Sequence, residues 1–395
     1  MKIRASAGPA ILTGLLSILP AVGLVLLPVA ADAATGPATD GGPGAVTPLA
    51  ALGPPPVPAD NPITAAKVEL GKLLFFDPRL SGDVSLSCAT CHDPAIGWQD
   101  GAEVCRGYPG TSHWRNCQSI INSAYYRKLF WAGSAKSLES QAPSAARGGV
   151  AGNGERDVME ERLRQIPEYN KRFKKVFGNA RPELPDAWKA IAAFERTLVQ
   201  RDTPFDLYML GDKNALGPAE LRGKELFEGK ARCIECHDGA LFSNEKYYNL
   251  GVPPNDVFDD DPLKQITFRF EQFAKGVSED LYRRTKIDLG LYYRTKQEHD
   301  IAKFRVPTLR YLVFTPPYMH NGVFFTLEEV IDFYDQGGGD DHAKLLTGTA
   351  TKTPVLRPLG LADDEKQDLI AFLESLTGEE LTMEPPELPR YGVFE

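Results

Sequence analysis

The sequence lacks the excess of positive charge that proteins binding nucleic acids carry. Its 395 residues include 44 lysine and arginine side chains against 53 aspartate and glutamate side chains, which gives a formal net charge of −9. Because the phosphate backbone of a nucleic acid attracts basic surfaces, this balance argues against a nucleic acid as the partner. Strand signals are also few. We therefore expect a mostly α-helical fold with long loops and little β structure.

Long apolar segments are missing after the N-terminus, so no later segment is predicted to cross a bilayer. At the N-terminus, a short basic start precedes an apolar run over residues 10–30 and an A-x-A-like site at residues 31–33. We expect residues 1–33 to form a secretory signal peptide. A retained membrane anchor is the alternative, but the two prolines in the run favour cleavage. The mature protein would then be periplasmic or secreted, with no stable membrane span.

Cysteine and histidine are scarce, with six of each, yet half of these twelve residues fall in two short motifs. Residues 88–92 read Cys-Ala-Thr-Cys-His and residues 233–237 read Cys-Ile-Glu-Cys-His. Two thiols at this spacing add across the vinyl groups of one porphyrin, and the following imidazole binds its iron. We predict two covalently bound haem c groups; zinc knuckles or thioredoxin-like dithiols are the alternative. The haem-attaching residues would be Cys88, Cys91 and His92 for the first haem and Cys233, Cys236 and His237 for the second.

The two remaining cysteines, Cys105 and Cys117, lie in a stretch rich in glycine, serine and arginine. Outside the cytoplasm they would most simply form a disulfide that closes this loop. A pair of free thiols and a metal site are the alternatives.

The order of segments suggests two domains, because about 360 residues remain after cleavage of the signal peptide. Residues 34–60 are rich in alanine, glycine and proline, so we expect a flexible or extended linker there rather than a packed element. A helix, a short turn, the motif and a glycine-containing loop follow one another around both motifs. We predict two cytochrome c-like haem domains of similar design at residues 61–205 and 206–380, followed by a tail at 381–395.

Apolar residues at helical spacing predict the main helices. These helices are expected at residues 64–76, 159–176, 185–199, 220–227, 326–334 and 362–376. The stretch from Pro253 to Ala302 is charged and aromatic, and we expect it to be irregular.

Several segments outside the motifs resemble the bacterial dihaem cytochrome c peroxidase and MauG family. The matching stretches are Leu-Ser-Gly-Asp at 80–83, Leu-Phe-Trp at 129–131, Ser-Leu-Glu-Ser-Gln-Ala at 137–142, Ala-Phe-Glu-Arg-Thr-Leu at 193–198, Phe-Arg-Val-Pro-Thr-Leu-Arg at 304–310 and Pro-Tyr-Met-His-Asn-Gly at 317–322. The resemblance runs from about Pro62 to Thr377, and it is closest to MauG-like members such as the methanobactin-associated MbnH-type enzymes.

The resemblance implies different roles for the two haems. The N-terminal haem, with His92 as its proximal ligand, would react with hydrogen peroxide, and the C-terminal haem on His237 would relay electrons. Tyr334 would be the second axial ligand of the C-terminal haem, at a position where cytochrome c peroxidases have methionine and MauG-type proteins have tyrosine. A phenolate is a hard, anionic donor that stabilises high-valent iron. A core tyrosine is the alternative.

Further residues receive roles from the same resemblance. Trp131 matches the tryptophan between the haems, whose indole is easily oxidised, and Gln141 matches the glutamine of the distal pocket. Asn116, Thr315 and Pro317 match a calcium site that uses one side chain and backbone carbonyls as hard oxygen ligands.

The distal pocket departs from the family pattern. A glutamate usually lies ten residues after the glutamine, at the position that is Ala151 in this chain. Either a nearby acid such as Glu155 or Glu160 takes its place, or proton transfer relies on Gln141 and water. His113 is the only nearby candidate for a distal histidine ligand, and we expect it at the surface instead.

The sequence therefore predicts a MauG-like dihaem peroxidase. It would use hydrogen peroxide to form a high-valent, bis-ferryl state and would oxidise a Trp or Tyr side chain of a protein partner at long range; a copper-associated periplasmic protein is one candidate partner. The alternative is a cytochrome c peroxidase that reduces peroxide to water with electrons from a small cytochrome or cupredoxin. A non-catalytic electron carrier with two six-coordinate haems is the rival outside the enzymes.

Overall fold

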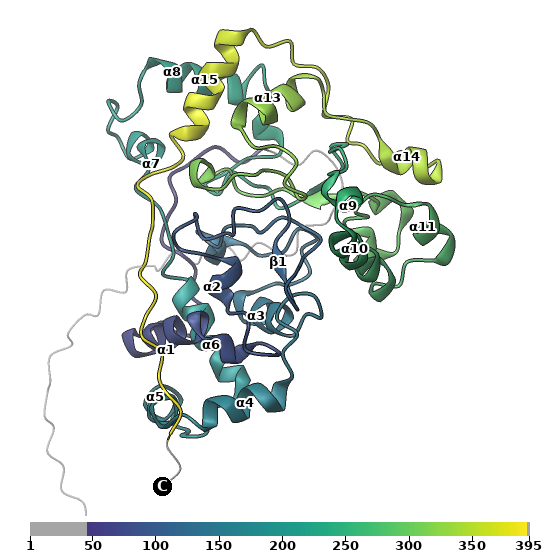
Figure 1. Ribbon diagram of the computed structural model, residues 1–395. Coiled ribbons are helices and arrows are strands. Elements are labelled where there is room, and N and C mark those ends of the chain that lie inside the picture. The colour runs from purple at the N-terminus through teal and green to yellow at the C-terminus, as the bar shows by residue number, and fades with distance from the viewer. Residues whose placement is uncertain (1–45, 393–395) are drawn as a thin grey trace, which may run out of the picture. The chain divides into compact units, whose positions relative to one another are not determined.

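A computed structural model of the chain describes residues 46–392, which are mostly helical, as the sequence predicts (Figure 1). The α-helices are α1 (Ala65–Phe76), α2 (Cys88–Cys91), α3 (Leu138–Ala146), α4 (Arg156–Arg164), α5 (Pro167–Phe177), α6 (Leu184–Glu195), α7 (Pro204–Met209), α8 (Pro218–Glu228), α9 (Val257–Asp260), α10 (Pro262–Ala274), α11 (Glu279–Arg284), α12 (Tyr292–Thr295), α13 (Leu327–Asp335), α14 (His342–Thr347) and α15 (Asp363–Glu374). Short 3-10 helices are η1 (Pro78–Leu80), η2 (Ser123–Tyr125), η3 (Cys233–Glu235), η4 (Glu298–Asp300) and η5 (Leu312–Phe314).

Strands are short and few in this range. β1 (Arg106–Gly107) pairs antiparallel with β2 (Thr111–Ser112), and β3 (Tyr247–Tyr248) pairs antiparallel with β4 (Phe304–Arg305). No helix among the described residues is long and apolar enough to cross a membrane. The predicted signal peptide and residues 34–45 of the predicted linker lie outside the described range.

A pair of closely packed helices supports the first motif. α1 crosses α6 at Gly71, where an added Cβ would lie 1.9 Å from the carbonyl oxygen of Ala190. Only glycine allows the two backbones to approach this closely. The pair is the centre of a hydrophobic cluster that includes Phe75, Trp98 and Phe194 and on which the first motif lies.

A second pair of helices supports the second motif in the same way. α8 crosses α15 at Gly223, where an added Cβ would lie 1.9 Å from the carbonyl oxygen of Asp368. Aromatic rings fill the core of this cluster and contact one another edge to face: Phe205, Phe227, Phe242 and Phe372. The two motifs thus share a local design, and the boundary predicted near residue 206 remains a prediction.

Five of the predicted helices correspond to α1, α6, α8, α13 and α15. The helix predicted over residues 159–176 is wrong in its extent, because this segment forms two helices, α4 and α5. Pro167 separates them, since proline has no N–H to continue α4 and is well suited to the first turn of α5.

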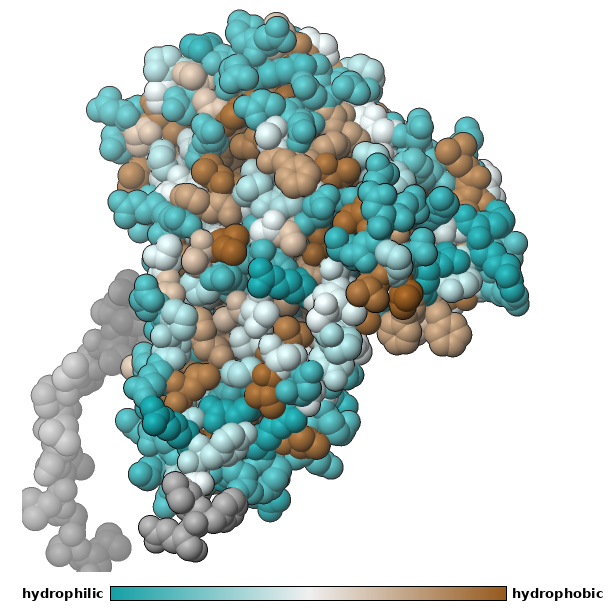
Figure 2. Space-filling view, in the orientation of Figure 1, coloured by the Kyte–Doolittle hydropathy of each residue, from teal (hydrophilic) through white to brown (hydrophobic). Residues whose placement is uncertain are grey.

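The prediction that residues 253–302 are irregular is also wrong, because α9 to α12 lie there. α10 has Asp261 as its N-cap, whose carboxylate accepts from the amides of Leu263 and Lys264. This helix buries Phe268 on one side, whereas the apolar side chains that recur at residues 263, 266, 270 and 273 form a stripe that faces solvent. The exposed fractions are 56% for Leu263, 62% for Ile266, 46% for Phe270 and 74% for Phe273. Hydrophobic side chains accordingly gather on the surface in the region of α10 (Figure 2).

Residues 46–60 contain no helix or strand, but they differ from the expected unpacked linker. Leu49 and Leu52 are buried, and the amide of Leu52 donates to Asp206 Oδ1 at 3.0 Å. The tail after α15 is packed as well. It runs back past α1 towards α5 (Figure 1), and the Leu381 carbonyl accepts from Trp98 Nε1 at 2.6 Å.

Candidate functional site

The first motif forms one helical turn, α2, that begins after Ser87 and ends at His92. His92 Nδ1 lies 3.2 Å from the carbonyl oxygen of Trp98. A proton on Nδ1 that is donated to this carbonyl leaves the lone pair of Nε2 free for a metal. Burial lowers the pKa of His92 to about 4, so the imidazole is neutral at physiological pH.

The second motif repeats this arrangement on η3. His237 Nδ1 lies 3.0 Å from the carbonyl oxygen of Phe242, and burial lowers the pKa of His237 to about 4. In both histidines Nδ1 faces a carbonyl oxygen a few residues further along the chain, which directs Nε2 away from that loop, and a second backbone group, of Gln118 or Pro307, also interacts with the ring. This geometry fits an axial ligand of haem iron.

The four motif cysteines are free thiols and are partly exposed. Burial raises the pKa of Cys91 to about 12 and that of Cys236 to about 11. A zinc knuckle needs four ligands around one point. Within residues 46–392 one group of three potential metal ligands is clustered, Cys91 with Cys105 and Cys117, and the latter two form a disulfide. The zinc alternative is therefore without a ligand set in this part of the chain.

The predicted disulfide between Cys105 and Cys117 is confirmed, with a Cα–Cα distance of 5.0 Å. Its sulfur atoms lie within 4.8 Å of the Cys91 sulfur, so the disulfide is next to the first motif. The closed loop contains His113, which we expected at the surface. The structure differs, because His113 is only partly exposed, its Nδ1 accepts from the Arg115 amide at 3.3 Å and burial lowers its pKa to about 3.

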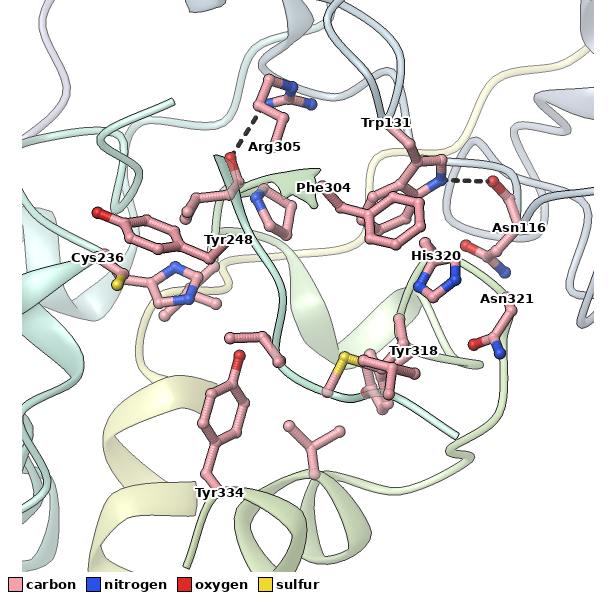
Figure 3. A pocket seen from close by; sticks show the side chains of 18 of the residues that line it. Asn116, Trp131, Cys236, Tyr248, Phe304, Arg305, Tyr318, His320, Asn321 and Tyr334 are labelled. Carbon is pink, nitrogen blue, oxygen red and sulfur yellow. Dashed lines mark hydrogen bonds between the residues drawn. The ribbon is translucent and has the colours of Figure 1, made fainter. Parts of the chain in front are cut away.

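A cavity of about 280 Å³ lies beside the second motif and is lined mainly by apolar side chains. The residues that line this cavity are far apart in the sequence (Figure 3). The predicted site residues that line it are Asn116, Trp131, Cys233, Cys236, His237, Thr315, Pro317 and Tyr334.

Tyr334 projects from α13 into this cavity, with its hydroxyl group directed towards the side where Cys236 lies (Figure 3). No described residue forms a hydrogen bond with this hydroxyl group. Burial raises the pKa of Tyr334, and negative charge on Cys236 and Cys233 would act in the same direction. A hydroxyl group that faces an apolar cavity without a protein partner fits the position of a ligand to a bound group.

Trp131 lies at the opposite end of the cavity from Tyr334 (Figure 3). Its Nε1 donates to the carbonyl oxygen of Asn116 at 2.9 Å, and its ring is 6.4 Å from that of His320 at an interplanar angle of 76°. His320 in turn stacks on Phe304, with 3.7 Å between ring centroids. The indole is thus held in one orientation inside an aromatic cluster.

Asn116, Thr315 and Pro317 line the same cavity. The Asn116 side chain donates from Nδ2 to the carbonyl of Ala102 at 3.1 Å, which leaves its Oδ1 as an acceptor. Within residues 46–392, no donor reaches this Oδ1 or the carbonyl oxygens of Thr315 and Pro317. Such a set of hard oxygen atoms suits a cation such as calcium.

Gln141 lies on α3 and is partly exposed, and its side chain has no hydrogen-bond partner in the described part of the chain. The acids proposed to replace the glutamate missing at Ala151 do not fit that role. Glu155 is exposed to solvent. Glu160 is buried but is held as a structural carboxylate, 2.7 Å from Arg164 Nη2, and ion pairing and hydrogen bonds lower its pKa.

Sequence reasoning assigned no role to Glu195, although it lies in a stretch that resembles the family. This residue of α6 is 5% exposed, and no described residue forms a hydrogen bond with its carboxylate. Burial raises the pKa of Glu195 to about 8, and its charge raises the pKa of the Cys88 thiol. The sequence signal for Glu195 was a carboxyl group among the apolar residues of a predicted helix.

Comparison with known proteins identifies relatives along nearly the whole chain. The family model described as "Di-haem cytochrome c peroxidase" matches residues 65–214. "Cytochrome-c peroxidase IdrP1" from Pseudomonas sp. (strain SCT) is 57% identical over 345 residues, which is 87% of this chain and 89% of that protein. "Methylamine utilization protein MauG" from Methylorubrum extorquens is 34% identical over 339 residues, 85% of this chain and 84% of that protein.

The fold has relatives among solved structures. A structure described as "a MauG-like protein associated with microbial copper homeostasis" has a TM-score of 0.71 and 31% identity, and covers 85% of this chain and 95% of that one. The diheme peroxidase BthA from Burkholderia thailandensis has a TM-score of 0.65 at 22% identity over 84% of this chain and 92% of its own, which shows the same fold.

Proposed function

Because the chain belongs to the di-haem cytochrome c peroxidase family, we propose that it reduces hydrogen peroxide to water with electrons from a small cytochrome or cupredoxin. Membership of this family implies two haem c groups, which would supply the redox chemistry when bound. The observation that carries the proposal is the 57% identity with a cytochrome-c peroxidase over 87% of the chain.

The residues of the chain would divide the work between the two motifs. His92 would bind the iron of the haem that meets peroxide, and Gln141 would orient the peroxide by a hydrogen bond from its side-chain amide. His237 would bind the iron of the haem that receives electrons. Trp131, held by its hydrogen bond to the Asn116 carbonyl, would carry electrons between the two haems.

A specific observation favours a second candidate function, the oxidation of a Tyr or Trp side chain of a protein partner. The Tyr334 hydroxyl group lies in the cavity that contains His237 and has no partner among residues 46–392. A phenolate ligand would lower the reduction potential of the iron there, which makes that iron a poorer acceptor for electrons from a mild donor. The 31% identical structure of a MauG-like protein agrees with this candidate.

The experiment that separates the two candidates measures whether peroxide consumption is coupled to a donor. Wild-type protein, whose intact mass should first show two haem groups, is mixed with peroxide and a reduced small cytochrome or cupredoxin. The first candidate requires two donor molecules to be oxidised per peroxide. Consumption of peroxide without oxidation of any such donor contradicts the first candidate and supports the second.

Tyr334→Met tests the role of the tyrosine in the same assay, with Tyr318→Phe as the control because Tyr318 lines the same cavity. If Tyr334 binds iron, Tyr334→Met should change the electron paramagnetic resonance signal of the C-terminal haem and raise its potential, whereas Tyr318→Phe should leave both unchanged. Identical spectra for all three proteins would make Tyr334 a packing residue.

We also propose that calcium binds Asn116 Oδ1 and the carbonyl oxygens of Thr315 and Pro317, with water as the remaining ligands. Since the Asn116 carbonyl accepts from Trp131, loss of the ion should disturb the path between the haems. Chelation should remove about one calcium per chain and change the haem spectra, and Asn116→Ala should abolish this response while Asn116→Asp retains it. Purified protein that contains no calcium would contradict the proposal.

An oxidising compartment outside the cytoplasm is the proposed location, because a disulfide between Cys105 and Cys117 persists there. Alkylation of protein from periplasmic and cytoplasmic fractions should find these two thiols blocked in the periplasm. Protein that is found only in the cytoplasm with both thiols free would contradict this location.

A further inference from the structure

Arg305 is a buried cation without a carboxylate partner among residues 46–392. The residue is 1% exposed and lies in the wall of the cavity that also contains His237 and Tyr334. A guanidinium group does not lose its proton in proteins, so burial leaves a full positive charge in the cavity wall. Such a charge is costly to bury unless an anion compensates it.

The contacts of the Arg305 guanidinium group are all neutral. Nε donates to the Phe130 carbonyl at 3.3 Å, Nη1 donates to the Val306 carbonyl at 3.1 Å (Figure 3), and Nη2 donates to Gln118 Oε1 at 3.4 Å. The guanidinium carbon also lies 4.0 Å from the centre of the Tyr126 ring. Because the group has five N–H donors, two of them remain available for an anion.

The other buried arginines show that this fold normally pairs such charges. Each of them has a carboxylate oxygen within 2.8 Å. The pairs are Arg79 with Asp77 at 2.7 Å, Arg115 with Asp288 at 2.5 Å, Arg196 with Glu139 at 2.7 Å and Arg310 with Asp206 at 2.8 Å. Arg305 has the lowest exposed fraction of these five residues and is the one without a carboxylate in the described chain. A bound group can supply the missing anion.

We propose that Arg305 binds a propionate of the haem that is attached at Cys233 and Cys236. The propionates are the anionic groups on the edge of a haem, and a carboxylate can accept two N–H bonds from one guanidinium group. The inference rests on the proposed haem at the second motif. The Arg305 amide also donates to the Trp131 carbonyl at 2.8 Å, so the propionate would be anchored beside the tryptophan.

The bond has a consequence for the reduction potential of that haem. A positive charge beside the propionate compensates its negative charge and stabilises the reduced iron relative to the oxidised iron. Removal of the guanidinium group should lower the potential and return the pKa of the propionate towards that of an ordinary carboxyl group.

The test compares holoprotein variants that lose the same formal charge at a buried and at an exposed position. Arg305→Gln removes the buried cation, and Arg283→Gln is the control because the Arg283 side chain is 72% exposed and pairs only with Glu279 on its own helix. We expect Arg305→Gln to change the ferrous-to-ferric ratio of the C-terminal haem at least tenfold at a fixed potential, which corresponds to about 59 mV. Arg305→Lys, which retains a charge, should give a smaller shift, and Arg283→Gln none.

Intact mass and resonance Raman spectra separate the role of Arg305 from loss of the haem or of the fold. Intact mass reports haem content, so a chain without the second haem overturns the proposed function, whereas two haems with unchanged potential overturn only the role of Arg305. A shift confined to the N-terminal haem also overturns it. If Arg305→Gln does not fold, the propionate bending band in resonance Raman spectra of wild type and Arg305→Lys decides: bands that coincide in the two proteins overturn the proposal.

Discussion

Glu195 tests how burial of a carboxyl group changes the pH dependence of stability, because this residue lies in the core beside the first motif. Its pKa is raised by burial from 4.5 to about 8, and the negative charge of Glu139 acts in the same direction while Arg196 opposes it. The folded state therefore holds a proton on Glu195 between about pH 4.5 and pH 8 that the unfolded state releases. Because Glu195 holds its proton more tightly in the folded state, the contribution of this residue to stability falls as the pH rises through this window.

The magnitude follows from the same numbers. The difference between 4.5 and about 8 corresponds to roughly 5 kcal/mol at 1.36 kcal/mol per pH unit, which is the upper limit of the loss. Glu195→Gln keeps the shape but cannot ionise, so it should lack this contribution to the pH dependence of the free energy of unfolding. The control is Glu69→Gln, which changes an exposed carboxyl group on α1.

The assay is denaturant unfolding of the holoprotein at pH 5 and pH 8, followed by circular dichroism. Between these values the free energy of unfolding of Glu195→Gln should change by several kcal/mol in the favourable direction relative to wild type and Glu69→Gln, because His113 and His320, whose pKa values burial lowers, act alike in all three proteins. Equal changes in all three proteins would refute the reasoning, because they would mean that Glu195 is ionised in the folded state or is reached by water.

Other predictions concern the packing of the same fold. Gly71→Val should cost about 1–3 kcal/mol or more of unfolding free energy, because the Cβ would approach a carbonyl of α6 within 1.9 Å; an unchanged melting temperature would contradict this crossing. Asp206→Asn should cost about 3–5 kcal/mol, since it leaves the buried Arg310 without its carboxylate, and thermal unfolding measures it. Replacement of both Cys105 and Cys117 by Ser should cost about 3 kcal/mol; wild-type stability in the double variant would show that the disulfide does not form.

Features that depend on local spacing could be predicted from the sequence. The two motifs, the disulfide and helices such as α6 and α15 are each encoded within a few residues, because a helix repeats every 3.6 residues and a haem motif spans five. α9, α11 and α12 are too short for this repeat to show. α10 does carry the repeat, with apolar residues at 263, 266, 270 and 273, but these side chains face solvent rather than the core.

Features that depend on contacts between distant segments could not be predicted in this way. Arg305 and Arg310 lie in one matched stretch, yet Arg310 pairs with Asp206 and Arg305 has no carboxylate within residues 46–392. Glu160 likewise looks like a free acid until the structure places the Leu184 amide 3.0 Å from its Oε1. Whether a charge is compensated depends on residues that are more than a hundred positions away, as in the pair of Arg115 with Asp288, which are 173 positions apart.

Arg305 and Tyr334 bear on the choice between the two candidate functions, because both line the cavity of the second motif. A phenolate from Tyr334 and an uncompensated propionate would place two negative charges near the same iron, and both would stabilise its oxidised form. Such an iron would be hard to reduce by a small cytochrome. The positive charge of Arg305 cancels one of the two, and it therefore restores part of the driving force that electron delivery needs. The unpaired guanidinium group would therefore support electron delivery to this haem, even with tyrosine as the second ligand.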